Sequence, residues 1–320
     1  HGNFNVTGTL SGRLSSNSPN LQNLPSGSEY GKLIKSCLEP PKDWLWVFSD
    51  YNSLEAVVNA KITQDPNKLK VLLEGYDSHS FNTYYYWKDK FSNLSLEPSS
   101  LNTIKKTHPN MREDSKPVTF ALQYFAEFRT LMVNSGFTEK EAKSIYNNYH
   151  NLYQVSDDWA ASKMKKAEST GFVEGCFGLR VRTPVIQQSL MGSKCTTSAA
   201  KAEYRSAGNA LTQSYCMLNS RSSIEFMDRV YNSKYCNDIK PIALIHDALY
   251  LIIKNDIDVL HWVNINLAKC MSWNDLPELQ QDTIPLGGEL DLCYPTWATS
   301  ITIPNNENKT KILKLAKELL

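Results

Sequence analysis

The stretches that decide the fold are WLWVFSDY at residues 44–51 and PIALIHDALYLII at residues 241–253. Each is a dense apolar run of the kind that forms a buried strand, and each contains one aspartate, Asp50 in the first and Asp247 in the second. We therefore predict a strand with Asp50 near its end and a hairpin with Asp247 at its turn.

The two aspartates suggest a shared role. A carboxylate beside such apolar runs is costly unless it is paired or binds a cation. Carboxylates on neighbouring strands can hold two divalent metal ions about 3.5–4 Å apart, which is the geometry of in-line phosphoryl transfer. Taken singly, each aspartate is better explained as an ordinary turn or capping residue, so the pair needs support from the rest of the sequence.

The segments around these two runs predict an α+β plan, in which strands occupy both ends of the sequence and helices fill the middle. The first thirty residues are rich in Gly, Ser, Asn and Pro and predict a loop with short strands. A strand is expected near 179–183 and a final strand near 288–292. Helices are expected over 52–63, 78–92, 110–134, 138–150, 155–170, 194–232 and 256–271.

Composition excludes several classes of protein. With 320 residues, 41% of them hydrophobic, the chain can bury a large core in one domain or in two closely joined ones. A net charge of +1 gives no sign of nucleic acid by itself. Seven scattered cysteines with no C-x-x-C pair indicate reduced thiols, as in the cytoplasm, and argue against a zinc site or a disulfide framework. No run of eighteen apolar residues is present, so we expect no membrane span.

Five blocks together resemble family A (DNA polymerase I-like) DNA polymerases, in that family's order and at plausible separations. In chain order, the second block is similar to the family's motif A. The third is similar to its motif B, the fourth to its R-x-x-x-N-x-x-x-Q segment and the fifth to its motif C. The blocks are TLSGRLSSNSPNLQNLP (9–25), SDYNSLEAVV (49–58), REDSKPVTFALQYF (112–125), EYRSAGNALTQS (203–214) and LIHDALYLII (244–253).

The resemblance implies a right-hand polymerase architecture. An antiparallel-sheet palm would comprise residues 1–70 and 173–320, and a helical fingers subdomain at residues 71–172 would be inserted into it. The implied activity is template-directed addition of dNTPs to a primer 3′-OH. Asp50 and Asp247 would be catalytic and would hold two Mg²⁺ ions.

The resemblance also assigns the dNTP-binding residues. Arg112, Lys116, Phe120 and Tyr124 recur every four residues, which on an α-helix places them along one face. Cations suit a triphosphate and aromatic rings suit a sugar and base, although an amphipathic helix would pack such rings inward. Glu55 is expected to exclude the ribose 2′-hydroxyl and to accept a hydrogen bond from Tyr124. The DSH triplet ending at His79 resembles a triphosphate-contacting D-I-H, and a helix cap is the alternative.

Primer-template contacts are implied for a third group of residues. Minor-groove acceptors are common to all base pairs, so side chains that contact them test pairing shape without reading sequence. His246 matches a residue placed near the primer terminus. The other members of the group are Arg13, Asn20, Gln22, Arg205, Asn209 and Gln213.

Several positions depart from the family pattern. Ala248 replaces the glutamate of motif C, which removes one acidic support for the metal site. Ala56 and Val57 replace Leu-Arg in motif A. In motif B, Ala121 and Phe125 replace two glycines. Pro117 falls inside the expected motif B helix, so we predict either a kink or a helix that begins closer to Lys116.

Two rival interpretations remain: a related single-subunit RNA polymerase, and a non-catalytic DNA-binding subunit with a decayed site. The family's thumb and exonuclease precede the first block, whereas about ten residues precede it here. This predicts a fragment or one subunit of a split enzyme. Its partners would be primer-template DNA, dNTPs and a second polypeptide carrying the thumb, with or without a 3′–5′ exonuclease. The expected location is the cytoplasm, with DNA, or the host cytoplasm for a viral protein.

Overall fold

The computed structural model describes residues 2–25, 28–193, 196–281 and 283–319. The chain forms two compact units. The sheet unit comprises residues 1–54, 216–277 and 285–320, and the helical unit comprises residues 55–215 and 278–284. Among the described residues, no helix is both long enough and apolar enough to cross a membrane.

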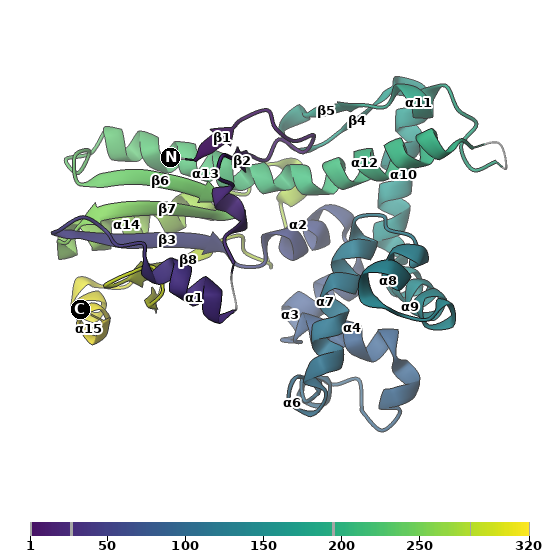
Figure 1. Ribbon diagram of the computed structural model, residues 1–320, viewed down its shortest axis with the longest axis horizontal. Coiled ribbons are helices and arrows are strands. Elements are labelled where there is room, and N and C mark those ends of the chain that lie inside the picture. The colour runs from purple at the N-terminus through teal and green to yellow at the C-terminus, as the bar shows by residue number, and fades with distance from the viewer. Residues whose placement is uncertain (1, 26–27, 194–195, 282, 320) are drawn as a thin grey trace. The chain divides into compact units, whose positions relative to one another are not determined.

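The sheet unit is built on five antiparallel strands in the order β6-β7-β3-β8-β9 (Figure 1). The central strand is β3, whose partners are β7 and β8. The strands are β3 (Trp44–Tyr51), β6 (Ile239–Ile245), β7 (Ala248–Lys254), β8 (Gly288–Cys293) and β9 (Ser300–Ile303). The predicted strand at 44–51 and the predicted hairpin are therefore confirmed.

The two faces of β3 differ because side chains alternate along a strand. Leu45, Val47, Ser49 and Tyr51 are buried. Helices α13 and α14 pack on each other and on the sheet (Figure 1). The opposite face carries an aromatic cluster in which Trp46 stacks on Trp297, with ring centroids 5.8 Å apart. The remaining elements of this unit are β1 (Asn3–Asn5), β2 (Ser15–Asn17), α1 (Glu29–Ser36), α13 (Met217–Tyr231), α14 (Ile257–Met271) and α15 (Lys309–Leu319).

The helical unit has its main core between α4, α7 and α9, where aromatic and aliphatic side chains are buried together. A second core lies where α10 and α12 meet the β4–β5 hairpin. Its elements are α2 (Leu54–Thr63), α3 (Pro66–Leu73), α4 (Ser78–Tyr86), α5 (Pro98–Leu101), α6 (Ile104–Thr107), α7 (Pro109–Gln123), α8 (Phe128–Ser135), α9 (Glu139–Leu152), α10 (Gln154–Thr170), β4 (Phe172–Glu174), β5 (Arg180–Arg182), α11 (Pro184–Gln187) and α12 (Ser198–Gln213).

Four predicted boundaries are wrong. The helix expected over 78–92 is α4, which ends at Tyr86, and a 3₁₀ turn follows at Lys88–Phe91. The helix expected over 110–134 is two helices, α7 and α8, because Phe125 has a φ of +64°, which no α-helix accommodates. The helix expected over 194–232 is two helices, α12 and α13, and residues 194–195 lie outside the described residues. A 3₁₀ turn at Ser214–Cys216 separates the two helices, and there the Ser214 hydroxyl donates to the Leu211 carbonyl. The strand at β8 does not close the chain, because β9 and α15 follow it.

Pro117 does not delay the start of its helix. Helix α7 begins at Pro109, in the first-turn position that suits proline, and continues through Pro117 to Gln123. A proline here leaves only the carbonyl of Glu113 without its usual donor, and Pro117 and Glu113 are both exposed to water. The predicted start near Lys116 is therefore wrong.

A prediction follows from the close contact of β8 with β3. A Cβ atom at Gly288 would lie 2.0 Å from the Asp50 carbonyl oxygen, so Gly288→Ala must push the strands apart. We expect a loss of about 1–3 kcal/mol in the free energy of unfolding, measured by urea or thermal denaturation. Gly287→Ala is the matched control, because a Cβ there meets nothing within 4 Å. Equal stability of the two variants would contradict the prediction.

Candidate active site

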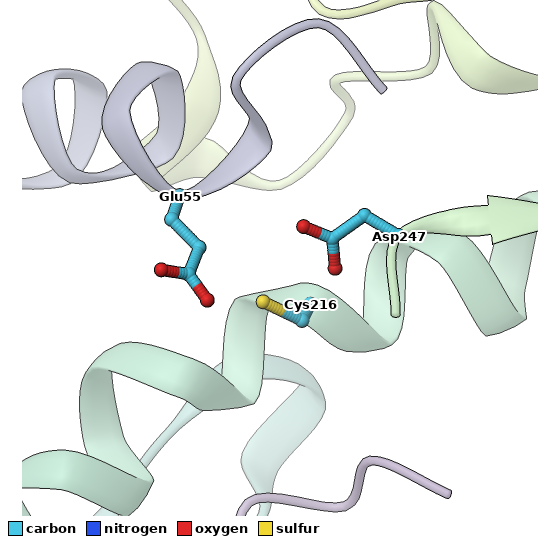
Figure 2. Close-up of side chains that lie close together, drawn as sticks. All are labelled: Glu55, Cys216 and Asp247. Atoms are coloured by element: carbon cyan, nitrogen blue, oxygen red, sulfur yellow. The ribbon is translucent and has the colours of Figure 1, made fainter. Parts of the chain in front are cut away.

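The sheet brings Asp50 and Asp247 to the same end of the unit. Asp50, the second-last residue of β3, lies opposite Ala248 on β7 and Glu289 on β8. Asp247 occupies the turn between β6 and β7 (Figure 2), and its carbonyl accepts a 3.2 Å hydrogen bond from the amide of Tyr51. The antiparallel register therefore makes neighbours of two aspartates that are almost two hundred residues apart in sequence.

The surroundings of Asp50 do not fully stabilise the negative charge of its carboxylate. The residue lies at the exposed end of its strand, yet protein atoms remove much of its carboxyl group from water. This loss of hydration, together with the charge of Asp247, raises the pKa of Asp50 to about 6. Asp291 adds a smaller contribution in the same direction. A bound cation would relieve the repulsion, so the pair fits a divalent metal site.

Other acidic residues share the face of Asp50. Glu289 faces Asp50 directly across the β3–β8 pairing, and Asp291 lies two residues further along β8. Neither residue is among the predicted site residues. The alternation of polar and apolar residues in GELDLC at 288–293 was the available signal. At the family's glutamate position, Ala248 is buried beside Tyr250 instead.

Three residues expected at primer-template lie on or against the hairpin that carries Asp247. The Arg13 Nη2 atom is 2.9 Å from Asp247 Oδ1, in a partly buried ion pair. Gln22 donates from Nε2 to the Leu244 carbonyl on β6 at 3.2 Å. His246 has a φ of +51°, and its carbonyl accepts from Asn219 at 3.2 Å. These contacts hold the N-terminal segment and α13 against the hairpin.

Asn20 and Cys216 occupy helix starts in the sheet unit. The Asn20 side chain accepts from the Gln22 amide and caps a short 3₁₀ turn at Leu21–Asn23. Cys216 is buried at the N-terminus of α13 (Figure 2). The sequence analysis gave Cys216 no role.

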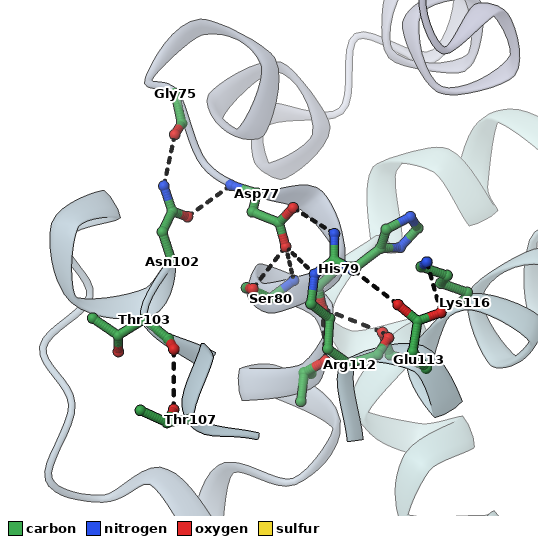
Figure 3. A network of polar contacts seen from close by, with 12 residues as sticks. Gly75, Asp77, His79, Ser80, Asn102, Thr103, Thr107, Arg112, Glu113 and Lys116 are labelled. Carbon is green, nitrogen blue, oxygen red and sulfur yellow. Dashed lines mark hydrogen bonds and ion pairs between the residues drawn. The ribbon is translucent and has the colours of Figure 1, made fainter. Parts of the chain in front are cut away.

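In the helical unit, Arg112 makes a bidentate ion pair that the sequence analysis missed (Figure 3). Its Nε and Nη2 atoms each lie 2.7 Å from the carboxylate of Asp77, the residue that caps α4. Burial disfavours the charge on Asp77. Hydrogen bonds from Arg112 and Ser80 outweigh that effect and hold the pKa of Asp77 well below its usual range.

His79 and Lys116 flank this ion pair (Figure 3). Burial, with the nearby charges of Arg112 and Lys116, lowers the pKa of His79, so its imidazole is neutral at pH 7. Its Nδ1 atom is buried without a hydrogen bond to any described residue. Lys116 pairs at 2.7 Å with Glu113, whose side chain is 60% exposed. Such an exposed pair exchanges partners at little cost.

The other two motif B residues lie further along the same chain segment. Phe120 is 46% exposed, so part of its ring lies at the surface of α7. Tyr124 caps the C-terminus of α7, and its hydroxyl donates a short hydrogen bond to the Glu55 carboxylate. This is the contact that the family resemblance implies.

Helix α12 carries Arg205, Asn209 and Gln213, which were predicted to contact primer-template. Arg205 lies 3.4 Å from the carboxylate of Glu127. The Asn209 Oδ1 atom is buried without a hydrogen bond to any described residue, and Gln213 is half-buried at the end of the helix. Their spacing of four residues keeps them on one side of α12.

Comparison with known proteins identifies the fold and the family. The structure superposes on the polymerase domain of Pol1 from M. smegmatis, solved in complex with DNA primer-template and dNTP, with a TM-score of 0.75 at 21% identity. The match covers 94% of this chain and 48% of that one, so the fold is the α+β fold of a Pol I polymerase domain. The family profile of DNA polymerase family A matches residues 1–291. The chain therefore belongs to DNA polymerase family A, as the motifs predicted.

Curated relatives agree at moderate identity. The thermostable DNA polymerase I of Thermus filiformis is 30% identical over 184 residues, 58% of this chain and 20% of that protein. The DNA polymerase I of Treponema pallidum is 29% identical over 216 residues, 67% of this chain and 20% of that protein. The chain thus spans about a fifth of the length of these relatives.

The Arg112–Asp77 pair predicts a pH-dependent contribution to stability. Asp77→Asn keeps a capping side chain but removes the charge, so it should lower the free energy of unfolding by about 1–3 kcal/mol at pH 7. Because the folded-state pKa of Asp77 is depressed, its contribution is complete above the ordinary value of 3.8. The contribution is lost as the pH falls toward the folded-state value.

Denaturation curves from pH 7 down to pH 3 measure this effect. The difference in the free energy of unfolding between wild type and Asp77→Asn should become smaller below pH 4. Asp77→Ala is the companion variant, since it also removes the cap and should cost about 1 kcal/mol more at every pH. A gap that stays constant with pH would show that the ion pair contributes nothing.

Proposed function

We propose that this chain is a DNA-directed DNA polymerase that adds dNTPs to a primer 3′-OH on a template. The observation that carries the proposal is the Asp50–Asp247 pair, placed at one end of an antiparallel sheet with the pKa of Asp50 raised to about 6. Asp50 and Asp247 would hold two Mg²⁺ ions, which supply Lewis acidity to the attacking hydroxyl and to the pyrophosphate leaving group.

The cationic groups of the helical unit suit the triphosphate. Lys116 can leave the exposed carboxylate of Glu113 for a phosphate at small cost. Arg112 is oriented by Asp77 and keeps further N–H donors on a rigid guanidinium. His79, held neutral, can donate or accept a hydrogen bond without adding charge. The exposed ring of Phe120 offers an apolar surface for the sugar and base.

Sugar selection is assigned to Glu55 and Tyr124. The hydrogen bond from the Tyr124 hydroxyl fixes the Glu55 carboxylate, so a ribose 2′-hydroxyl beside it would meet a side chain that cannot move away. Primer-template binding is assigned to polar side chains that can contact groove acceptors common to all base pairs. These are Arg13, Asn20, Gln22, Arg205, Asn209, Gln213 and His246.

The palm and fingers assignments are part of the same proposal. Residues 1–70 and 173–320 would form the palm and residues 71–172 the fingers. The two compact units divide instead at Leu54/Glu55 and Tyr215/Cys216. The match covers 48% of the solved polymerase domain. Elements beyond the matched part would add to the grip on duplex DNA, because phosphate contacts supply most non-specific DNA affinity.

Primer extension by substituted chains tests the metal-binding role. Asp50→Asn and Asp247→Asn should each lower the extension rate by about a thousandfold or more, because the carboxylates position the reacting groups. Binding of primer-template, measured by fluorescence anisotropy, should persist. Asp89→Asn, at an exposed site in the helical unit, is the control and should extend normally. Near-normal extension by either active-site variant would remove the mechanism, and wild-type use of rNTPs over dNTPs would favour an RNA polymerase.

Competition between dNTP and rNTP tests the sugar selection. Glu55→Ala should raise the relative use of rNTP by about tenfold or more, since it removes the group beside the 2′ position. Tyr124→Phe removes only the hydroxyl that fixes Glu55 and should shift the ratio less. Glu139→Ala alters another first-turn helix glutamate, and the ratio should not change. A ratio unaffected by Glu55→Ala would assign the selection to another residue.

A further inference from the structure

Phe125 has an unusual backbone conformation. It follows Tyr124 directly, at the end of α7, and its φ of +64° lies in the left-handed region that favours glycine. Position 125 is one of two in this segment where the family pattern has glycine. A large side chain persists in that conformation only if its surroundings hold it there.

The surroundings of the Phe125 ring contain a second unusual choice, Gly208. This glycine is buried in the middle of α12, where alanine would be the more favourable helix former. A Cβ atom at Gly208 would lie 2.7, 2.8 and 2.9 Å from three carbon atoms of the Phe125 ring. The ring also meets Tyr204 edge-on, with centroids 6.1 Å apart. Phe125 therefore occupies a position whose backbone conformation favours glycine. Its ring packs against Gly208, which occupies a helix position where alanine would be the better helix former.

The contact joins two functional groups of residues. On the α7 side, Tyr124 precedes Phe125 in sequence and bonds to Glu55. On the α12 side, Arg205 and Asn209 lie on either side of Gly208. A ring fixed against α12 therefore fixes the last turn of α7, and with it the direction of the Tyr124 hydroxyl.

We propose that Phe125, seated on Gly208, is a positioning residue for sugar selection, which it exerts through the Tyr124–Glu55 hydrogen bond. The inference rests on the proposed polymerase function. Phe125 also lines a cavity of about 760 Å³ in the helical unit, together with Tyr146 and Tyr204. Stacking of a template base on the ring is therefore the competing role that the experiment must separate.

A stability cycle tests the contact without any assay of activity. Gly208→Ala in a helix ordinarily raises the melting temperature, because alanine restricts the unfolded chain. Here it should lower the melting temperature by about 2 °C or more, because the new methyl group meets the ring. In a Phe125→Ala background the same change should cause no loss. An equal effect in both backgrounds would overturn the contact.

Nucleotide selection tests the positioning role. Phe125→Gly relieves the backbone strain yet should raise the relative use of rNTP about threefold or more, because Tyr124 loses its support. Gly208→Ala should act in the same direction, and adding it to Phe125→Gly should have no further effect. In a Phe125→Gly, Tyr124→Phe double variant the two effects should not add. A ratio unchanged in Phe125→Gly would overturn the proposal, as would weaker DNA binding with selection intact, which is the result expected of base stacking.

The two levels of inference fail in different ways. A wild-type chain that incorporates no dNTP, alone or with a thumb-bearing partner, would overturn the proposed function and the selection role together. The stability cycle would still decide whether Phe125 and Gly208 are packed as described.

Discussion

The antiparallel register of β3 between β7 and β8 is the constraint on which the site depends. Because side chains alternate along a strand, a shift of one residue would turn Asp50 toward α13 and α14 and expose Val47 and its buried neighbours. The apolar residues of the buried face therefore fix the position of the carboxylate. The cost of this arrangement is the unfavourable ionisation of Asp50, which the packing of the rest of the sheet must offset.

The sequence predicts the elements that rest on periodicity. The strand at 44–51, the hairpin and α14 follow from apolar patterns that leave few alternatives. The breaks after α7 and α12 could not be predicted in this way. The first depends on the positive φ of Phe125, a residue that rarely adopts it. The second is a 3₁₀ turn at Ser214–Cys216, which no apolar period marks.

The candidate site likewise contains some contacts that could be predicted from the sequence and others that could not. The family resemblance, and not any spacing in the sequence, implied the partnership of Tyr124 with Glu55. The bidentate contact between Arg112 and Asp77 joins residues 35 apart in sequence, and no local pattern encodes it. Likewise, the acidic partners of Asp50 on β8 become visible only once the strand order is known.

The ion pair of Arg13 with Asp247 bears on how the site can change on binding. Both side chains are partly exposed, at 23% and 18%, so water moderates the strength of their attraction. On the proposed function, Arg13 neutralises Asp247 before a cation arrives and is then available to primer-template. Among the described residues, no ion pair joins Asp50 to an arginine, and burial together with the charge of Asp247 raises the pKa of Asp50. Asp247 is thus paired with a cation of the protein, while the raised pKa of Asp50 indicates a carboxylate that a cation from solution would stabilise.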